Sequence, residues 1–343
     1  MKGVVILGQG ELEIREFPDP EPGPDEIVIT MKASGMCGTD LHHLREPCRR
    51  TEDKIFIEGH EPCGVVSAVG EAVHPQEASV GDRVMIHHYD GCRVCQYCRS
   101  GWTQLCPNAK VIYGGPNGHG AHAQFMKVPA HTAIQMPDGL SFKAGAAISC
   151  GAGTAYGAVK RVDLCGDDTV AIFGQGPVGL AATIFAKEFG ARVIALDIGE
   201  ERLQMAKSFG ADFVVNPLKE DPVEAIRALT VRGEGATKSI ECSSNPDARR
   251  QAIQCVKRWG TACMVGAYGD ISFSTQEIIQ LQKTVLGSLT FSKNMMDDCA
   301  QWVVQRGIDL EKLFTHEFRL DQAHEAYELF DQQKIGKGVF VFD

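Results

Sequence analysis

Hydrophobic and polar positions follow one pattern in the first part of the chain and another in the middle. Between Met1 and about Pro137, short segments rich in valine, isoleucine and glycine are separated by turn sequences such as "PDPEPGPDE" and "GDRV". Short apolar segments bounded by glycine, proline and aspartate are typical of β-strands joined by turns. The pattern therefore predicts a β-rich region with long loops over this part of the chain.

From about Val170 the pattern changes to longer alternating units. "TVAIFG", "RVIALD" and "ADFVVN" are each typical of a buried strand, and helical patterns that end at Gly190 and Gly210 lie between them. Strands that alternate with helices of about 10 to 15 residues predict βαβ units and a parallel sheet. The alternation continues to about Gly287, after which we expect a helix in "MMDDCAQWVVQRG" and a closing strand in "GKGVFVFD".

The length and the two patterns together predict two domains, the second inserted in the first. A chain of 343 residues has room for both. We expect an α/β fold in which residues 1–151 and 290–343 form a β-rich domain. Residues 152–289 are expected to form a doubly wound parallel sheet.

Composition and charge narrow the class of protein. The net charge is −10 and there is no basic block, which argues against nucleic acid or an anionic membrane as a partner. No apolar stretch reaches the roughly 18 residues of a membrane span. The first residues, "MKGVVILGQG", lack a secretory pattern. We therefore expect a cytoplasmic protein.

The chain contains 13 cysteines, an odd number, so a scaffold of disulfides is not expected in a protein of this length. Some cysteines stand singly among apolar residues, and these we interpret as small buried hydrophobic residues. They are Cys165, Cys242, Cys255, Cys263 and Cys299.

A glycine-rich turn in "AIFGQGPVGL" indicates a dinucleotide site. Gly174, Gly176 and Gly179 form G-x-G-x-x-G between a predicted strand and a predicted helix, the context that this motif requires. The first glycine permits the tight turn, the second lets a pyrophosphate approach the backbone, and the third lets helix and strand pack closely. Pro177 and Val178 complete the turn at the helix N-terminus, where free N–H groups favour phosphate.

Asp197 follows the second predicted strand, about 20 residues after the turn, where the motif requires an acidic residue. A carboxylate there accepts hydrogen bonds from the ribose hydroxyls and repels a 2′-phosphate, which favours NAD over NADP. Arg202 lies five residues later, so some use of NADP stays open.

Four further cysteines lie in "GCRVCQYCRSGWTQLC", at Cys92, Cys95, Cys98 and Cys106. Four thiolates that close within one loop suit tetrahedral Zn²⁺ and leave no open coordination position. Redox cysteines usually come as a single C-x-x-C pair. The spacing therefore predicts a structural zinc.

A second set of metal-binding residue types is scattered along the chain. Cys37, His60 and Cys150 would supply the Cys₂His set of a catalytic zinc, which needs three protein ligands and an open position. Spacing alone does not establish this set.

Six segments resemble the zinc-containing medium-chain alcohol dehydrogenases. They occur in the order typical of that family and are "GMCGTDLH", "GHEPCGVVSAVG", "VGDRV", "GCRVCQYCRSGWTQLC", "ISCGAGTAYGAV" and "GQGPVGLAA". The resemblance implies a GroES-like catalytic domain, an inserted Rossmann domain and a substrate cleft between them. It implies two zinc ions per chain, NAD as the cofactor, and a homo-oligomer in which a tetramer is favoured over a dimer.

The same resemblance implies roles for individual residues. Cys37, His60 and Cys150 would bind the catalytic zinc. Glu61 would enter the coordination sphere of this zinc transiently, and Asp40 would orient His60. Thr39 matches the position that takes the proton from the alcohol, His42 the residue that passes it through the cofactor ribose to solvent, and Thr154 a position near the nicotinamide.

Counting back from the four cysteines places His88 at a substrate-pocket position of the family, and aligning "GAHAQFMKVPA" with its usual pattern places His122 at another. Imidazoles would supply hydrogen-bond donors and acceptors to the pocket. This favours a substrate with a second polar group, such as a diol, hydroxy acid or amino alcohol. Arg45, Arg49 and Arg50 either meet an anionic substrate group or form a solvated loop.

The sequence therefore predicts a zinc-dependent alcohol dehydrogenase that acts reversibly on secondary or functionalised alcohols. A polyol or amino-alcohol dehydrogenase is the alternative if the histidines line the pocket, although Cys150 stands where those branches typically have glutamate. A zinc-free reductase and a non-catalytic relative are remote alternatives, because the complete ligand set argues against both.

Overall fold

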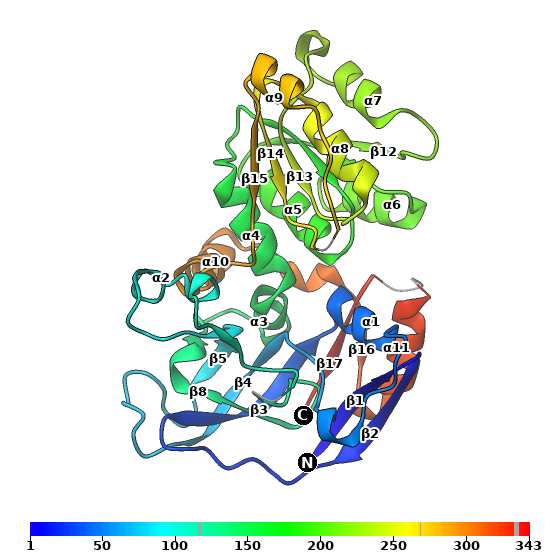
Figure 1. Ribbon diagram of the computed structural model, residues 1–343. Coiled ribbons are helices and arrows are strands. Elements are labelled where there is room, and N and C mark those ends of the chain that lie inside the picture. Colours follow the sequence, from blue (N-terminus) through cyan, green and yellow to red (C-terminus); the bar gives the residue numbers. More distant parts are fainter. Residues whose placement is uncertain (116–117, 268, 333–335) are drawn as a thin grey trace. The chain divides into compact units, whose positions relative to one another are not determined.

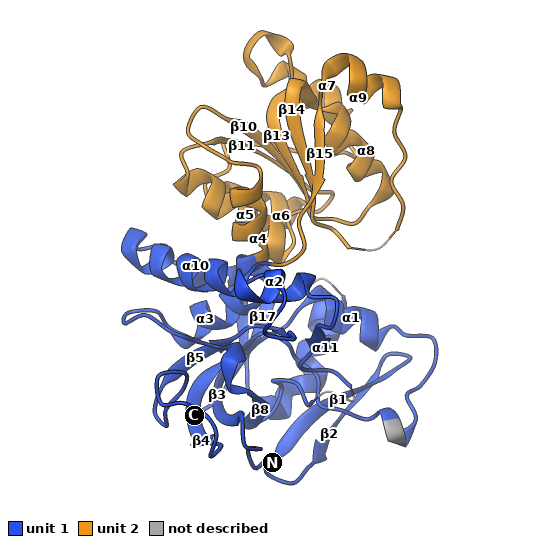
Figure 2. Cartoon of the chain, turned by 60° about the vertical axis from the view of Figure 1, so that its left-hand side comes forward, with its two compact units in different colours: residues 1–153, 291–343 blue, residues 154–290 orange. Residues whose placement is uncertain are grey.

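The computed structural model describes residues 1–115, 118–267, 269–332 and 336–343. The chain divides into two compact units, shown in blue and orange in Figure 2. Unit 1 consists of Met1–Gly153 and Phe291–Asp343, and unit 2 of Thr154–Thr290. Among the described residues, no helix has the length and apolar character needed to cross a membrane.

Unit 2 is built on a six-stranded parallel sheet with the strand order β12-β11-β10-β13-β14-β15, of which β12, β13, β14 and β15 are labelled in Figure 1. Its strands are β10 (Thr169–Phe173), β11 (Arg192–Leu196), β12 (Phe213–Val215), β13 (Ala236–Glu241), β14 (Val256–Met264) and β15 (Thr284–Gly287). Its helices are α5 (Pro177–Glu188), α6 (Glu200–Ser208), α7 (Pro222–Ala228), α8 (Pro246–Gln254) and α9 (Thr275–Leu281), with a 3₁₀ turn η4 (Val231–Gly233). Helix α4 (Gly151–Arg161) begins at the end of unit 1.

The order in which the chain adds strands to this sheet changes side between β10 and β13. After β10, helices α5 and α6 lead to β11 and β12 on one side. Helices α7 and α8 then lead to β13 and β14 on the other side. Because βαβ crossovers are right-handed, the two pairs of helices cover opposite faces of the sheet. The predicted doubly wound parallel sheet is confirmed, and its switch point lies at the carboxyl ends of β10 and β13.

The helix after β10 begins and ends where the sequence predicts. Pro177 stands at the first helical position of α5, where its missing N–H costs nothing. The helix buries a face rich in small residues, and Gly190 follows it with φ +86°. A glycine in this left-handed conformation is the usual end of a helix.

Unit 1 holds a seven-stranded sheet with the order β16-β17-β3-β4-β5-β9, in which β8 also pairs with β3. The strands of unit 1 are β1 (Lys2–Gly8), β2 (Glu11–Glu16), β3 (Glu26–Gly35), β4 (Pro62–Val69), β5 (Arg83–Ile86), β6 (Tyr89–Asp90), β7 (Lys110–Val111), β8 (Phe125–Pro129), β9 (Ala133–Gln135), β16 (Phe314–Phe318) and β17 (Lys337–Val341). Of these, β1 pairs with β2 and β6 with β7 outside the seven-stranded sheet. Its helices are α1 (Gly38–Leu44), α2 (Gln96–Arg99), α3 (Phe142–Ser149), α10 (Lys293–Arg306) and α11 (Ala323–Asp331). Short 3₁₀ turns are η1 (Glu52–Lys54), η2 (Thr103–Leu105), η3 (Ala130–Thr132), η5 (Leu310–Leu313) and η6 (Leu320–Gln322).

The predicted β-rich start of the chain is confirmed, with one addition. Helix α1 interrupts it directly after β3, where Cys37 caps the helix and its backbone N–H donates to the Asp40 carboxylate. The closing segment of the chain returns to the same sheet, since β17 pairs with β3. The two ends of the chain therefore build one core around the start of α1.

Two of the five cysteines expected in the core are not fully buried. Cys165 is exposed, because it lies in the turn between α4 and β10, where its thiol is 3.5 Å from an Asp168 carboxylate oxygen. Cys242 is partly buried. Cys255, Cys263 and Cys299 are buried as expected.

His87 follows β5 and ties three segments of unit 1 together. Its Nδ1 lies 3.2 Å from Thr103 Oγ1, and its Nε2 lies 3.1 Å from the carbonyl oxygen of Phe291. Burial lowers the pKa of this imidazole to about 4. A neutral, buried histidine therefore joins β5 to the loop that carries the four clustered cysteines and to the start of α10.

Gly179 is the glycine of the β10–α5 turn that tolerates a side chain least. A Cβ on Gly179 would lie inside the van der Waals radius of the Gly174 carbonyl oxygen, whereas a Cβ on Gly176 would meet nothing within 4 Å. We expect Gly179→Ala to lower the free energy of unfolding by about 1–3 kcal/mol. Gly176→Ala, the matched control, should lower it by less than about 1 kcal/mol. Denaturant titration measures both, and equal losses would contradict this close packing.

His87 should make stability depend on pH below neutrality. Its pKa is about 4 in the folded chain, against about 6.5 for an unperturbed histidine, so between these values the unfolded chain binds the extra proton. The contribution of neutral His87 is therefore fully present above about pH 6.5 and is lost as the pH falls towards 4, by up to roughly 3 kcal/mol. The difference in unfolding free energy between wild type and His87→Gln should shrink over that range, whereas exposed His316→Gln should run parallel to wild type.

Candidate active site

Three expected metal ligands from distant parts of the sequence lie together in unit 1. Cys37 caps the start of α1, His60 precedes β4, and Cys150 follows the last residue of α3. One ligand atom of each, together with a carboxylate oxygen of Glu61, lies within 4.8 Å of the others. The two thiol sulfurs are 4.0 Å apart. Two sulfurs, an imidazole and a carboxylate that face one point are a donor set that suits zinc.

Asp40 faces the ring of His60 from within α1. Its Oδ1 lies 3.2 Å from His60 Nδ1, which leaves Nε2 as the free donor atom of the imidazole. Burial opposes the charge of Asp40, but His60 and His122 beside it lower the pKa of the carboxyl below its usual range. A carboxylate that holds one ring nitrogen while the other meets a metal is the usual arrangement at zinc sites.

Glu61 is held by a buried lysine that comes from the other end of the chain. Lys337, on β17, is 2 % exposed, and its Nζ lies 2.7 Å from Glu61 Oε1 and 2.6 Å from Oε2. Lys337 also donates to the carbonyl oxygen of Met36. Burial raises the pKa of Glu61 to about 7, and the ammonium of Lys337 opposes that rise. Gly35 has no Cβ, which leaves the space that this carboxylate occupies.

The two thiols of this set differ in their affinity for a proton. The hydrogen bond with Cys150 lowers the pKa of Cys37 against the effect of burial, and His60 lowers it further. The hydrogen bond with Cys37 and burial both raise the pKa of Cys150. A bound metal ion would favour the thiolate form of both residues.

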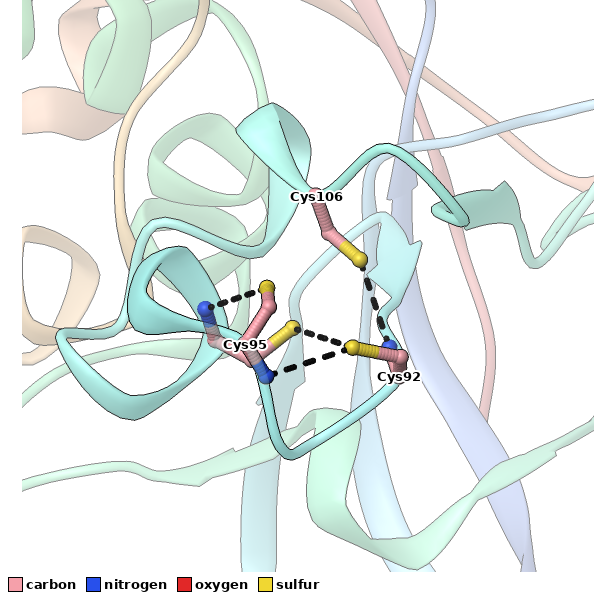
Figure 3. A group of neighbouring side chains, drawn as sticks. Cys92, Cys95 and Cys106 are labelled. Carbon is pink, nitrogen blue, oxygen red and sulfur yellow. Dashed lines mark hydrogen bonds between the residues drawn. The ribbon is translucent and has the colours of Figure 1, made fainter.

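The four clustered cysteines form a closed site in the loop that holds α2 and η2. Figure 3 shows the sulfurs of Cys92 and Cys106 turned towards the same space, with Cys95 beside them. One sulfur of each of the four cysteines lies within 4.8 Å of the others. A Cβ on Gly91 would lie 2.5 Å from Cys98 Sγ, so a larger residue there would close the space.

Backbone amides of the same loop point at these sulfurs. The N–H groups of Cys95 and Cys98 donate to Cys92 Sγ and Cys95 Sγ at 3.4 and 3.5 Å. Those of Cys92 and Asn108 donate to Cys106 Sγ at 3.4 Å. Backbone hydrogen bonds lower the pKa of Cys92 to about 6, and N–H donors of this kind stabilise thiolates. The loop therefore fits a tetrahedral metal with no open position.

The expected proton-transfer residues lie on α1. Thr39 Oγ1 is 3.9 Å from Cys37 Sγ, so its hydroxyl lies beside the three-ligand set. His42 is exposed on the same helix. One residue thus lies at the metal ligands and the other at the solvent.

His88 lies against the three-ligand set with one nitrogen unused by the protein. It is 3 % exposed, and its ring meets that of His60 edge to face at 5.6 Å. Tyr113 Oη is 3.5 Å from His88 Nδ1, whereas Nε2 has no hydrogen-bond partner among the described residues. Burial lowers the pKa of His88, so the ring stays neutral. A buried polar atom without a partner is rare, and this one belongs to a ring that contacts the ring of His60.

His122 does not have the place expected for a residue of the substrate pocket. Its side chain has no exposed surface, and both ring nitrogens are used within the protein. Nδ1 lies 2.8 Å from Ser34 Oγ, and Nε2 lies 2.9 Å from Tyr327 Oη. We therefore no longer assign His122 to a substrate pocket.

The three arginines after α1 each pair with acidic groups of the chain. Arg45 binds Asp331, and Arg49 lies 3.4 Å from Glu11. Arg50 is 8 % exposed and binds the buried carboxylate of Glu58. These ion pairs use the charges that an anionic substrate would need, which favours the structural interpretation of the loop.

The glycine-rich turn of unit 2 has the conformation that the motif requires. Gly174 has φ +85°, and Gly176 caps α5 without a side chain. The turn lies at the switch point of the sheet, where parallel α/β folds bind nucleotides. Thr154, the first residue of unit 2, is buried.

Asp197 is fixed at the end of β11 by backbone amides. Its Oδ2 accepts from the N–H of Gln175 at 2.7 Å, and its Oδ1 accepts from that of Gly199 at 2.8 Å. Arg202 Nη1 lies 3.8 Å from Oδ2. The carboxylate thus lies beside the glycine-rich turn, and Arg202 is close to it.

Sequence reasoning missed two residues of this site. Lys337 could have been suspected, because it is a charged residue in the apolar closing strand "GKGVFVFD". Tyr327 lies in α11 in an ordinary amphipathic pattern, and no local signal distinguishes it from a core residue.

Two family models match the chain. The alcohol dehydrogenase GroES-like domain matches residues 23–138, and the zinc-binding dehydrogenase domain matches residues 177–305. An uncharacterised zinc-type alcohol dehydrogenase-like protein of Escherichia coli is 36% identical over 100% of this chain and 99% of its own length. An alcohol dehydrogenase of Geobacillus stearothermophilus is 32% identical, with 94% of this chain and 93% of that one covered. A sorbitol dehydrogenase of Bacillus subtilis is 31% identical, with 96% and 93% covered.

Solved structures agree with these relatives. An alcohol dehydrogenase from Thermus sp. ATN1 superposes with a TM-score of 0.92 at 28% identity, with 99% of each chain covered. An alcohol dehydrogenase from Escherichia coli CFT073, solved with NADH, superposes with a TM-score of 0.89 at 26% identity, with 100% of this chain and 99% of that one covered. Together with the ligand sets of unit 1, these similarities show that the chain belongs to the zinc-type alcohol dehydrogenases of the medium-chain dehydrogenase/reductase family.

Proposed function

We propose that this protein is a zinc-dependent alcohol dehydrogenase that transfers hydride reversibly between an alcohol and NAD. The observation that carries the proposal is the meeting of Cys37, His60 and Cys150 at one point in a chain of this family. We also propose that the two units are the domains expected from the sequence, a catalytic domain and an inserted cofactor-binding domain.

We assign two zinc ions to each chain. Cys37, His60 and Cys150 would hold the catalytic ion and leave one position open, whereas the four clustered cysteines would hold a structural ion. When bound, the catalytic zinc supplies Lewis-acid chemistry at the hydroxyl oxygen of the substrate. Asp40 keeps the ring of His60 in place, and Lys337 holds Glu61 next to the ligands.

The residues of α1 would carry the proton away from the reacting alcohol. Thr39 Oγ1, beside Cys37, takes the proton from the substrate hydroxyl, and the exposed imidazole of His42 delivers it to solvent. A hydroxyl can accept one proton while it donates another, and histidine changes charge near neutral pH, so both residue types suit a proton relay.

We assign NAD to the glycine-rich turn of unit 2. The residues that would hold it are Gly174, Gly176, Pro177, Val178, Gly179 and Asp197, with Thr154 near the nicotinamide. The fixed carboxylate of Asp197 would accept hydrogen bonds from the ribose hydroxyls and repel a 2′-phosphate, which supports NAD as the cofactor. Arg202 lies close enough to Asp197 to be partly neutralised by it, which weakens the case for NADP.

The substrate we favour is a secondary or functionalised alcohol with a second polar group. His88 supports this choice, because its buried Nε2 has no partner among the described residues and a substrate hydroxyl or amine could supply one. A polyol or amino-alcohol dehydrogenase is the second candidate, which the similarity to a sorbitol dehydrogenase also supports.

We also propose a homo-oligomer, a tetramer in preference to a dimer. Strand β15 is the last strand of the unit 2 sheet and pairs with β14 on one side. The outer edge of such a strand is a ready template for a strand of a second chain.

The two proposed zinc sites can be separated by single cysteine substitutions. We expect two zinc ions per wild-type chain by elemental analysis. With secondary alcohols, the rate of NAD reduction should exceed the rate of NADP reduction.

Cys150→Ser should retain one zinc and lose at least about 100-fold in kcat/KM, since Lewis-acid catalysis supplies several kcal/mol. Cys95→Ser should lose the structural zinc and stability. Cys299→Ser, at a buried cysteine in α10, is the control that keeps both ions. Full turnover in Cys150→Ser would refute the proposed function.

His88 should decide between plain and polar substrates. We expect His88→Phe to lower kcat/KM for vicinal diols and amino alcohols by about 10- to 100-fold more than for a plain secondary alkanol, because one hydrogen bond to the substrate is lost. His87→Phe is the matched control, since both nitrogens of that buried ring are used by the protein. It should cost stability without favouring one substrate class, and an equal effect of His88→Phe on all substrates would remove His88 from the pocket.

A further inference from the structure

A continuous string of buried polar side chains lies next to the three-ligand set of unit 1. Ser34, Asp40 and His122 have no exposed surface, and Tyr327 is 1 % exposed. They come from the consecutive elements β3 and α1, from the segment before β8, and from α11, so three distant parts of the sequence meet here. Polar groups without water are costly unless each has a partner.

Polar contacts lead from Ser34 to His60. Ser34 Oγ is 2.8 Å from His122 Nδ1, and His122 Nε2 is 2.9 Å from Tyr327 Oη and 3.8 Å from Asp40 Oδ2. Asp40 Oδ1 in turn lies 3.2 Å from His60 Nδ1. The string therefore ends on the ring of an expected metal ligand.

The buried polar atoms from Ser34 to Tyr327 can be paired in one direction. Ser34 can donate to Nδ1 of His122, whose Nε2–H can donate to the oxygen of Tyr327. Burial and the charge of Asp40 raise the pKa of Tyr327, so its hydroxyl keeps its proton. Asp40 Oδ1 lies beside His60 Nδ1, which leaves Nε2 of His60 for the metal position.

The backbone holds the ring of His122 directly against the segment that carries His60. The N–H groups of Gly120, Ala121 and His122 donate to the carbonyl oxygens of Ile57, Gly59 and Glu58 at 2.7, 2.8 and 2.8 Å. Gly59 has φ +94°, and a Cβ on it would lie 2.5 Å from His122 Nδ1. The ring thus packs on the residue before the ligand, and neither partner has room to turn.

We propose that His122 and Tyr327 are positioning residues of the zinc site, which fix the carboxylate of Asp40 and through it the ring of His60. This inference rests on the proposed zinc-dependent function. An aromatic ring without nitrogen at position 122 would fill the same space beside Phe340, whose ring is 4.8 Å away, but it would leave Tyr327 and Ser34 without their partner. The histidine is therefore used for its hydrogen bonds and not for its bulk.

The test is the affinity of the catalytic site for metal, measured apart from activity. We would remove both ions, restore zinc or Co²⁺, and follow chelator competition and the absorption of Co²⁺ bound to thiolate. Tyr327→Phe and His122→Phe should weaken the three-ligand site by about 10- to 100-fold and shift the cobalt spectrum, as loss of residues behind a metal ligand usually does. His122→Gln, which keeps a donor near the position of Nε2, should restore most of the affinity. The four-cysteine site of the same molecule is the internal control and should not change.

A double-mutant cycle separates positioning from general damage to the core. If Tyr327 acts through Asp40, Asp40→Asn should weaken the site, and Tyr327→Phe should add nothing to that variant. Tyr156→Phe, at a buried tyrosine of unit 2, controls for the loss of a buried hydroxyl. Affinities within about twofold of wild type for Tyr327→Phe and His122→Phe, or full additivity with Asp40→Asn, would overturn the proposal while the function stands. A wild-type chain that takes up one metal ion only, at the four cysteines, would overturn the proposed function and this inference with it.

Discussion

The buried carboxylate of Asp40 is the group on which the rest of the metal site depends. It accepts from the backbone N–H of Cys37 and faces the ring of His60, so it fixes two expected ligands at once. A carboxylate without exposed surface is stable only where hydrogen bonds and opposite charge replace water. The backbone N–H of Cys37 and the rings of His60 and His122 lie around it. Segments that are distant in the sequence therefore pack around this one side chain.

The accumulation of negative charge around the ligands imposes a second constraint. Two thiols and Glu61 lie close together, and Lys337 is the cation that faces them from β17. Removal of one partner from such a buried pair costs several kcal/mol, because the other charge is left without compensation. The last strand of the chain is therefore part of a site whose expected ligands all lie in the first 150 residues. The pairing of β17 with β3 beside α1 places Lys337 there.

Local features of the site were predictable, and features that depend on distant partners were not. The four cysteines lie in one loop and the glycine-rich turn lies in one βα unit, so their spacing states the geometry directly. Cys37, His60 and Cys150 are far apart in the sequence and were recognised only through the family resemblance. His88 and His122 look alike in the sequence, yet one keeps a free nitrogen beside the ligands and the other is enclosed by Ser34 and Tyr327.

The sequence by itself determined the fold class, the order of strands and helices, the dinucleotide turn and the four-cysteine loop, because each follows from residues that are neighbours in the chain. Only the tertiary structure decided which polar residues face the site and which support it. It turned His122 inward, paired Arg50 with Glu58, and brought Lys337 and Tyr327 to the ligands. The physical reason is that a buried polar group must find its partner wherever the packed chain supplies one, and the position of that partner is a property of the fold and not of the local sequence.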